Sequence, residues 1–94
     1  MTRVAFESLK LLAEINPEAV RWTYCDDAII GVAKRKDTPV LVYEREKLLM
    51  CFMGMGMNEQ QADEWVSFNI DGAWLGENTP LMSDFSESSP KTEQ

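Results

Sequence analysis

Apolar residues recur at helical spacing near the start of the chain. Over residues 3–15, the residues that share one face of a helix are Val4, Ser8, Leu11, Leu12 and Ile15. We therefore predict an amphipathic helix over this range, packed on the core through that face. Asn16 and Pro17 end the helix, and they suit the N-cap and the first position of a short turn that follows.

Two segments after this helix are typical of β-strands. Residues 28–34 and 39–44 are rich in valine and isoleucine, and the polar linker 35–38 between them suits a hairpin turn. Both strands carry apolar residues on both faces, so both faces must be covered. Because a hairpin alone is marginally stable in water, we expect the sheet to be completed by a third strand, from residues 21–25 or after residue 73, or by a partner subunit.

Helical spacing returns in residues 44–53 and again in residues 58–69. Gly54 fits the position just after the first of these helices, where a left-handed backbone commonly ends a helix. The second helix begins with a capping box, in which Asn58 is the N-cap and Gln61 lies three residues later. The elements together predict an α+β fold, in which a small antiparallel hairpin or a three-stranded sheet packs with three to four helices.

The length of 94 residues suits one domain. We predict a single globular domain over residues 1–81, followed by a disordered acidic and serine-rich tail over residues 82–94. No apolar run approaches the ~20 residues of a membrane span, and the first residues lack the apolar core of a signal peptide. A cytoplasmic location without membrane association is therefore expected.

Asn69 stands out in the last predicted helix. The helical period places its amide within the apolar stripe of residues 58–69. A buried amide without a partner costs on the order of 1–3 kcal/mol, so its hydrogen-bond partners should be specified. Two readings stay open: the amide ties down the following loop by bonding backbone groups, or it is offered to a ligand there.

The loop after that helix, residues 70–80, combines flexible and aromatic residues. Gly72 and Gly76 flank Trp74, and glycine permits positive φ or close backbone approach. The glycines either let the chain lay Trp74 on the core or expose its indole to a partner, as at many interface hot spots. The candidate binding residues of this region are Asn69, Asp71, Trp74, Glu77 and Asn78.

Charge is distributed unevenly along the chain. Residues 1–57 are neutral, whereas residues 58–94 hold one lysine against eight carboxylates and so carry the entire net charge of −7. An acidic surface repels nucleic acid and attracts basic surfaces. A basic protein partner is therefore expected, and direct nucleic-acid binding is not.

Signatures of catalysis or metal binding are weak. The chain has no histidine, which excludes Ser-His-Asp and Cys-His catalysis. Cys25 and Cys51 form no Cys-x-x-Cys pair and are expected to be free, partly buried thiols. The methionines of residues 50–57 suit packing or an adaptable surface more than Cu(I) binding, and no cofactor or metal is expected. The adjacent Asp26 and Asp27 are the remaining enzymatic candidates.

The chain resembles a group of small proteins of tailed phages and prophages whose activity is not established. The resemblance covers residues 16–82, without the methionine-rich segment before Gly56 and without the tail. The matching positions are residues 27–32, 42–44, 56–57, Ala62, Asn69, residues 72–74, Gly76 and residues 79–80. It implies a phage accessory protein that acts in the host cytoplasm.

Three function classes follow. The favoured hypothesis is a binding protein, not an enzyme, that docks the loop 69–80 and the adjoining acidic surface on a host or phage protein and modulates host machinery or defence. The alternative is a homo-oligomer, in the simplest case a homodimer, that binds a nucleotide or another small ligand beside Asn69, Asp71 and Trp74. The third is a metal-dependent hydrolase that uses Asp26 and Asp27.

Overall fold

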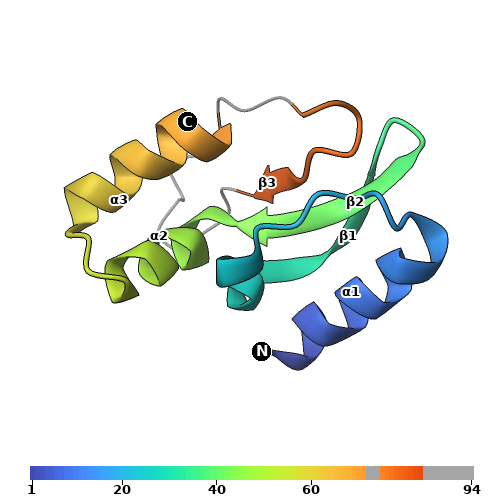
Figure 1. Ribbon diagram of the computed structural model, residues 1–94, viewed down its shortest axis with the longest axis horizontal. Coiled ribbons are helices and arrows are strands. Elements are labelled where there is room, and N and C mark those ends of the chain that lie inside the picture. The colour runs from blue at the N-terminus through green and yellow to red at the C-terminus, as the bar shows by residue number, and fades with distance from the viewer. Residues whose placement is uncertain (72–74, 84–94) are drawn as a thin grey trace, which may run out of the picture.

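A computed structural model describes residues 1–71 and 75–83 of the chain, and this part has the predicted α+β fold (Figure 1). Within the described residues there are three α-helices and one three-stranded sheet. In chain order the elements are α1 (Arg3–Ile15), the 3-10 segment η1 (Thr23–Ala28), β1 (Ile29–Arg35), β2 (Thr38–Glu44), α2 (Arg45–Gly54), α3 (Glu59–Val66), the π-helical turn η2 (Ser67–Asp71) and β3 (Leu81–Ser83).

The sheet has the order β1-β2-β3. β1 and β2 form the predicted antiparallel hairpin, and Lys36 in its two-residue turn has a φ of 58°. β3 pairs with β2 in parallel, so the prediction of a third strand after residue 73 is confirmed. The other candidate, residues 21–25, is wrong: this segment runs into η1, and its Trp22 packs its ring on Tyr43.

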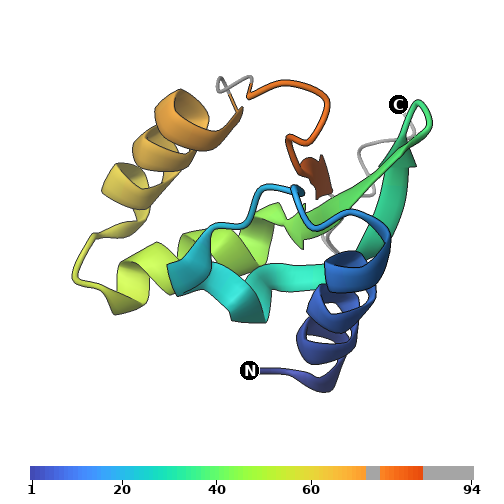
Figure 2. The same ribbon diagram turned by 45° about the vertical axis from the view of Figure 1, so that its right-hand side comes forward.

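The helices lie at two ends of the sheet (Figures 1 and 2). α1 packs on β1 and β2, while α2 continues directly from β2 and packs against η1 and α3. A parallel neighbour cannot be reached by a tight turn. The α2–α3 pair supplies the long connection that returns the chain to the sheet as β3.

The buried face of α1 differs from the predicted one. Ala5, Ser8 and Leu12 are buried, whereas Val4, Leu11 and Ile15, which were expected to pack on the core, are about half exposed. The helix is therefore rotated about its axis relative to the expectation. Small side chains explain the choice, because Ala5 and Ser8 let the helix approach the strands closely.

Asn16 ends α1 and begins the predicted short turn, in which Ala19 N–H donates to Asn16 O at 3.0 Å. Its own backbone N–H donates to Leu12 O, which makes it the C-cap of α1; the predicted N-cap role is corrected, because its side chain bonds distant groups. Its side-chain amide donates to Pro39 O at 2.8 Å and to Asn78 Oδ1 at 2.9 Å. One amide thus joins the end of α1, the start of β2 and the loop before β3.

α2 ends one residue later than predicted, and the glycine that follows it with a left-handed backbone lies two residues later. Gly54 is still helical, and the residue with positive φ is Gly56, at 111°. The N–H of Gly56 donates to Met53 O and that of Met57 donates to Phe52 O, which is the pair of bonds of a Schellman motif. The glycine chemistry was anticipated correctly, but at the wrong glycine.

α3 begins as predicted and ends differently. Asn58 accepts from Gln61 N–H, and the Gln61 side chain accepts from Asn58 N–H, so the capping box is confirmed. The α-helical ladder stops at Val66, and the chain continues as the π turn η2. Hydrogen bonds in such a turn span five residues, so each residue turns less about the axis than in an α-helix.

Tyr43 lies at the centre of the core. It is fully buried between the sheet and η1, and its hydroxyl accepts from Trp22 N–H at 2.9 Å. Among the described residues, every buried side-chain nitrogen or oxygen has a hydrogen-bond partner.

In the same part of the chain, no helix is long and apolar enough to span a bilayer.

Candidate functional site

One face of α3 and η2 exposes aromatic side chains. Phe68 is 81% exposed and Trp65 is 39% exposed, although the ring of Trp65 also packs on Phe52 with centroids 4.6 Å apart. The opposite face of the same segment is anchored in the core through Ala62, Val66 and Ile70. The aromatic residues are therefore held on a fixed support while remaining accessible.

A shallow groove of about 370 Å³ runs along this face. We call it the aromatic face, and its residues are Met57, Gln61, Glu64, Trp65, Phe68 and Asn69. Four of them, at positions 61, 64, 65 and 68, have the i, i+3, i+4, i+7 spacing of one helix face. Apolar groups that line a groove and are rimmed by polar ones commonly mark an interaction site.

The charge around the aromatic face is negative. Glu59, Asp63 and Glu64 are exposed on α3, and residues 48–83 contain no lysine or arginine. Arg45 on α2 donates to Asp63 at 3.1 Å and to Ser67 Oγ at 3.0 Å. Glu64, which lines the groove, and the absence of basic residues over positions 48–83 give the groove an acidic character.

Asn69 lies on this face, but it is exposed and not buried as expected. Its Nδ2 donates to Trp65 O at 3.1 Å, one turn back along the same segment. The π turn explains the difference, because the smaller rotation per residue moves Asn69 away from the buried stripe. Asn69 lines the groove and remains a candidate for contact with a ligand or partner.

Glu77 and Asn78 lie elsewhere, at the turn that precedes β3. The side-chain oxygen of Asn78 accepts a hydrogen bond from the Asn16 amide, and its backbone oxygen accepts from Val20 N–H. Glu77 accepts from Thr38 Oγ1 at 3.5 Å. Both sets of contacts lead to α1 and the hairpin, away from Asn69. Among the described candidates, Glu77 and Asn78 therefore belong to a different set of contacts from Asn69, which bonds Trp65 O.

The turn containing these residues is held by its own hydrogen bonds. Buried Thr79 accepts from Leu75 N–H and donates to Gly76 O, and Gly76 has the expected positive φ, at 92°. Arg35 of β1 donates to Thr79 O and Pro80 O. Trp74 and Gly72 lie outside the described residues, as does the side chain of Asp71, so their roles stay predictions.

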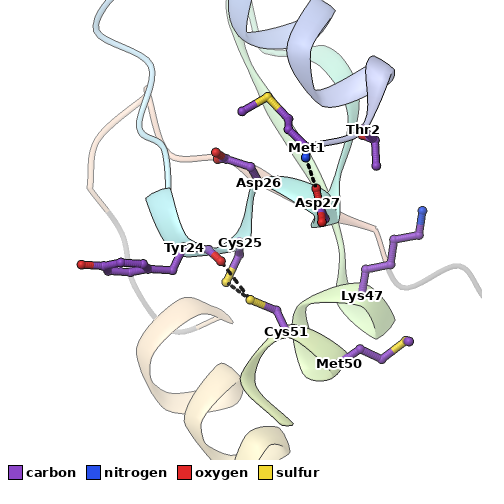
Figure 3. A pocket seen from close by; sticks show the side chains of 9 residues that line it. All are labelled: Met1, Thr2, Tyr24, Cys25, Asp26, Asp27, Lys47, Met50 and Cys51. Atoms are coloured by element: carbon purple, nitrogen blue, oxygen red, sulfur yellow. Dashed lines mark hydrogen bonds and ion pairs between the residues drawn. The ribbon is translucent and has the colours of Figure 1, made fainter. Parts of the chain in front are cut away.

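A second hollow, of about 590 Å³, opens where the start of α1, η1 and α2 meet (Figure 3). We call it the dithiol pocket, and its lining includes Tyr24, Cys25, Asp27, Lys47, Met50 and Cys51. Figure 3 shows the two sulfur atoms pointing toward each other, one from η1 and one from α2, while the Tyr24 ring points away.

Both thiols are free, as predicted, but they are neighbours. The two Sγ atoms are 3.0 Å apart, and Cys51 Sγ also lies 3.1 Å from Tyr24 O, to which its thiol donates. Cys25 is buried and Cys51 is half-buried. Burial, followed by the hydrogen bond with Cys51, raises the pKa of Cys25 to about 12. Cys25 therefore stays a neutral thiol at neutral pH.

Asp26 and Asp27 each have their own cationic partner. Asp26 forms a two-point ion pair with Arg21, at 2.7 and 3.0 Å, and this pair raises the pKa of the Arg21 guanidinium. Asp27 lies 3.4 Å from the amino group of Met1, and the two carboxylates point in different directions (Figure 3). No cluster of three or more side chains suited to hold a metal ion occurs within residues 1–71 and 75–83.

Two features of these sites were not identified from the sequence. Phe68 had a signal, since it is a large aromatic residue on the polar side of an otherwise well-patterned helix. The Cys25–Cys51 pair had none, because 26 positions separate the two residues and only the docking of α2 on η1 brings them together.

Comparison of the chain with protein-family models, with curated proteins and with solved structures gives no match. The two sites are therefore interpreted from their own chemistry.

Proposed function

We propose that this protein is a binding protein that docks its aromatic face on a segment of another protein, and that this segment carries both basic and apolar side chains. The observation that supports it most is Phe68, an aromatic residue that is 81% exposed beside a groove on a core-anchored helix. An isolated exposed leucine needs no explanation, but a phenylalanine and a tryptophan on one groove do.

The rigidity of the support favours binding over simple exposure. A capping box fixes the start of α3, and Val66 and Ile70 fix its end in the core. A preformed surface loses little conformational entropy when a partner docks. Trp65, half-covered by Phe52, supplies the kind of aromatic anchor that dominates many interfaces.

The acidic character of the groove supports a basic partner. Glu64 lines the groove on a stretch that lacks basic residues, so lysine or arginine beside an apolar side chain is the complementary pattern. Nucleic acid would be repelled by the same field. The proposed contact surface therefore lies on α3 and η2 and not on the whole loop 69–80 expected from the sequence. Asn69 belongs to both surfaces.

The resemblance to small proteins of tailed phages supports a biological setting for this activity. We propose an accessory protein that acts in the host cytoplasm by occupying a basic segment of a host or phage protein. An accessory role by occupancy needs no catalytic group.

Selection from a random peptide library tests this proposal. The intact protein serves as bait, and the variant Phe68→Asp, which places a charge in the groove, serves for counter-selection. We expect the enriched peptides to combine lysine or arginine with apolar residues, and to bind several-fold more weakly when salt rises from about 50 to about 300 mM. Enrichment of acidic or uncharged peptides, or no enrichment over the variant, would refute the proposal.

A further inference from the structure

We propose that Cys25 and Cys51 close a reversible intramolecular disulfide by exchange with a low-molecular-weight disulfide that enters the dithiol pocket. The two sulfur atoms are already 3.0 Å apart, and a disulfide bond is about 2.0 Å long. A shift of about 1 Å, shared between η1 and α2, closes the bond. This chemistry is independent of the proposed docking function.

The pocket gives an external disulfide access to one sulfur before the other. Cys51 is half-buried on α2 at the pocket wall, whereas Cys25 is buried beneath it in η1. Burial also holds Cys25 in its neutral thiol form, which is a poor nucleophile. Cys51 is therefore the attacking residue, and Cys25 is the residue that resolves the intermediate.

The polar groups around the sulfurs suit a zwitterionic disulfide. Lys47, one turn before Cys51 on α2, lines the pocket and is half exposed, with a long ion pair to Glu44 at 3.9 Å. Asp27 also lines the pocket and is largely exposed beside the amino group of Met1. Glutathione disulfide and cystine carry both carboxylate and ammonium groups. Lys47 can therefore pair with a carboxylate of the ligand, and an acidic side chain of the pocket can pair with its ammonium group. The volume of about 590 Å³ suits a molecule of this class better than a macromolecule.

The exchange proceeds in two balanced steps. The Cys51 thiolate attacks one sulfur of the external disulfide, which forms a mixed disulfide and releases one external thiolate that takes up a proton. The Cys25 thiol then loses its proton and its sulfur attacks Cys51 Sγ, which releases the second external thiol. In total the protein loses two hydrogen atoms, and one external disulfide is reduced to two thiols.

Formation of the Cys25–Cys51 disulfide would also change the stability of the fold. The bond joins η1 to α2, elements that are held together now by noncovalent packing. It also constrains the unfolded chain, because it closes a loop between positions 25 and 51. We expect the melting temperature of the oxidised protein to be roughly 10 °C higher than that of the reduced protein.

Mass spectrometry of the intact protein after incubation with glutathione disulfide tests the proposal. We expect the wild-type chain to lose two hydrogen atoms and to yield a Cys25–Cys51 cross-linked peptide, which a phosphine reductant reverses. Cys25→Ser should accumulate one glutathione on Cys51. Cys51→Ser should react roughly tenfold more slowly, because only the buried thiol remains. Circular dichroism melting checks that each variant is folded, and Cys25→Ala replaces Cys25→Ser if serine unfolds this apolar site.

Three outcomes would overturn the inference. Wild-type protein that stops at the mixed disulfide shows that Cys25 cannot reach Cys51. Covalent dimers on a non-reducing gel show that the thiols react between molecules instead. Wild-type protein that stays fully reduced shows that the pair is not redox-active, whether or not Cys25→Ser is glutathionylated.

Discussion

At the residue scale, Tyr43 shows how a polar group is used inside this small core. Its ring is fully buried and tilted against Trp22, and its hydroxyl accepts the Trp22 N–H. Burial raises the pKa of the hydroxyl to about 12, partly offset by that hydrogen bond. Burial is also the main reason why the pKa of the nearby Cys25 thiol is raised to about 12. Both groups are neutral in the folded protein and ionise more easily after unfolding.

The pH dependence of stability follows from these two groups. Their pKa values in the unfolded chain, 10.0 and 9.0, lie below the folded values of about 12. Their contribution is therefore intact below about pH 9 and is lost as the pH rises toward 12. Urea denaturation at several pH values should show the free energy of unfolding falling by about 2 kcal/mol or more over that interval. A free energy that stays constant up to pH 12 would contradict the burial of both groups.

Tyr43→Phe separates the hydrogen bond from the titration. At pH 7 we expect a loss of about 1–2 kcal/mol, since the Trp22 N–H loses its partner. Between pH 10 and 12 the variant should lose less stability than the wild type, because one titrating group is gone. Denaturation of the two proteins side by side measures both effects, and equal slopes above pH 10 would show that Tyr43 does not titrate as described.

The Asn16–Asn78 bond makes a second residue-scale prediction. Asn16→Ala and Asn78→Ala should each lower the free energy of unfolding by about 1 kcal/mol. Because the two amides bond each other, the double variant should be about 0.5–1 kcal/mol more stable than the sum of the single effects implies. Chemical denaturation of the four proteins measures this coupling. Strict additivity would mean that the bond does not contribute in solution.

At the element scale, local patterns predicted much of the fold. The capping box at Asn58, the helix of residues 3–15 and the hairpin all depend on neighbours in sequence, and all three are present. The errors arise where distant packing decides. Which side of α1 is buried depends on the strands it meets, and the end of α3 depends on the π turn that moves Asn69 outward.

The candidate site follows the same division. Negative charge beside an aromatic helix end was visible in the sequence, but Phe68 as its most exposed residue was not selected. Asn78 shows why a binding role is hard to predict from the sequence. Its side-chain amide accepts a hydrogen bond from Asn16, 62 positions earlier, so the residue stabilises the fold. The dithiol pocket depends in the same way on the docking of two distant elements.

The end of α2 tests whether the helix stops where the structure places it. Gly56→Ala should lower the free energy of unfolding by about 1 kcal/mol, because φ is 111° there. Gly54→Ala is the matched control: Gly54 is helical with open space around its Cα, so alanine should raise the free energy of unfolding by about 0.5–1 kcal/mol. Thermal melting of both variants gives the signs. The reverse order of effects would place the Schellman turn at Gly54.

At the scale of the whole molecule, two surfaces expose apolar side chains, and they differ in the charge around them. The excess of carboxylates lies after residue 57 in the sequence, and three of them, Glu59, Asp63 and Glu64, are exposed on α3. A separate apolar stripe, made of Val4, Leu11 and Ile15, is about half exposed on α1. The first surface suits a basic partner. The second carries no comparable charge excess and suits a second copy of the same chain.

We therefore expect a homodimer at high micromolar concentration, formed through the α1 stripe. Leu11→Glu should dissociate it, because a carboxylate cannot be buried there without a partner. Ala13→Glu is the matched control, since Ala13 is exposed on the opposite side of the same helix. Sedimentation velocity over a range of concentrations measures the outcome. A wild-type protein that stays monomeric throughout, or a dimer that survives Leu11→Glu, would contradict this use of α1.

The most direct test of the docking proposal compares two aromatic residues of equal exposure. Phe68 on the aromatic face is 81% exposed, and Tyr24 on η1 is 83% exposed. With a peptide selected on the wild-type protein, isothermal titration calorimetry should show at least about tenfold weaker binding for Phe68→Ala and less than about twofold change for Tyr24→Ala. Equal dissociation constants for the two variants, or a larger loss for Tyr24→Ala, would contradict the assignment of the α3–η2 face as the binding surface.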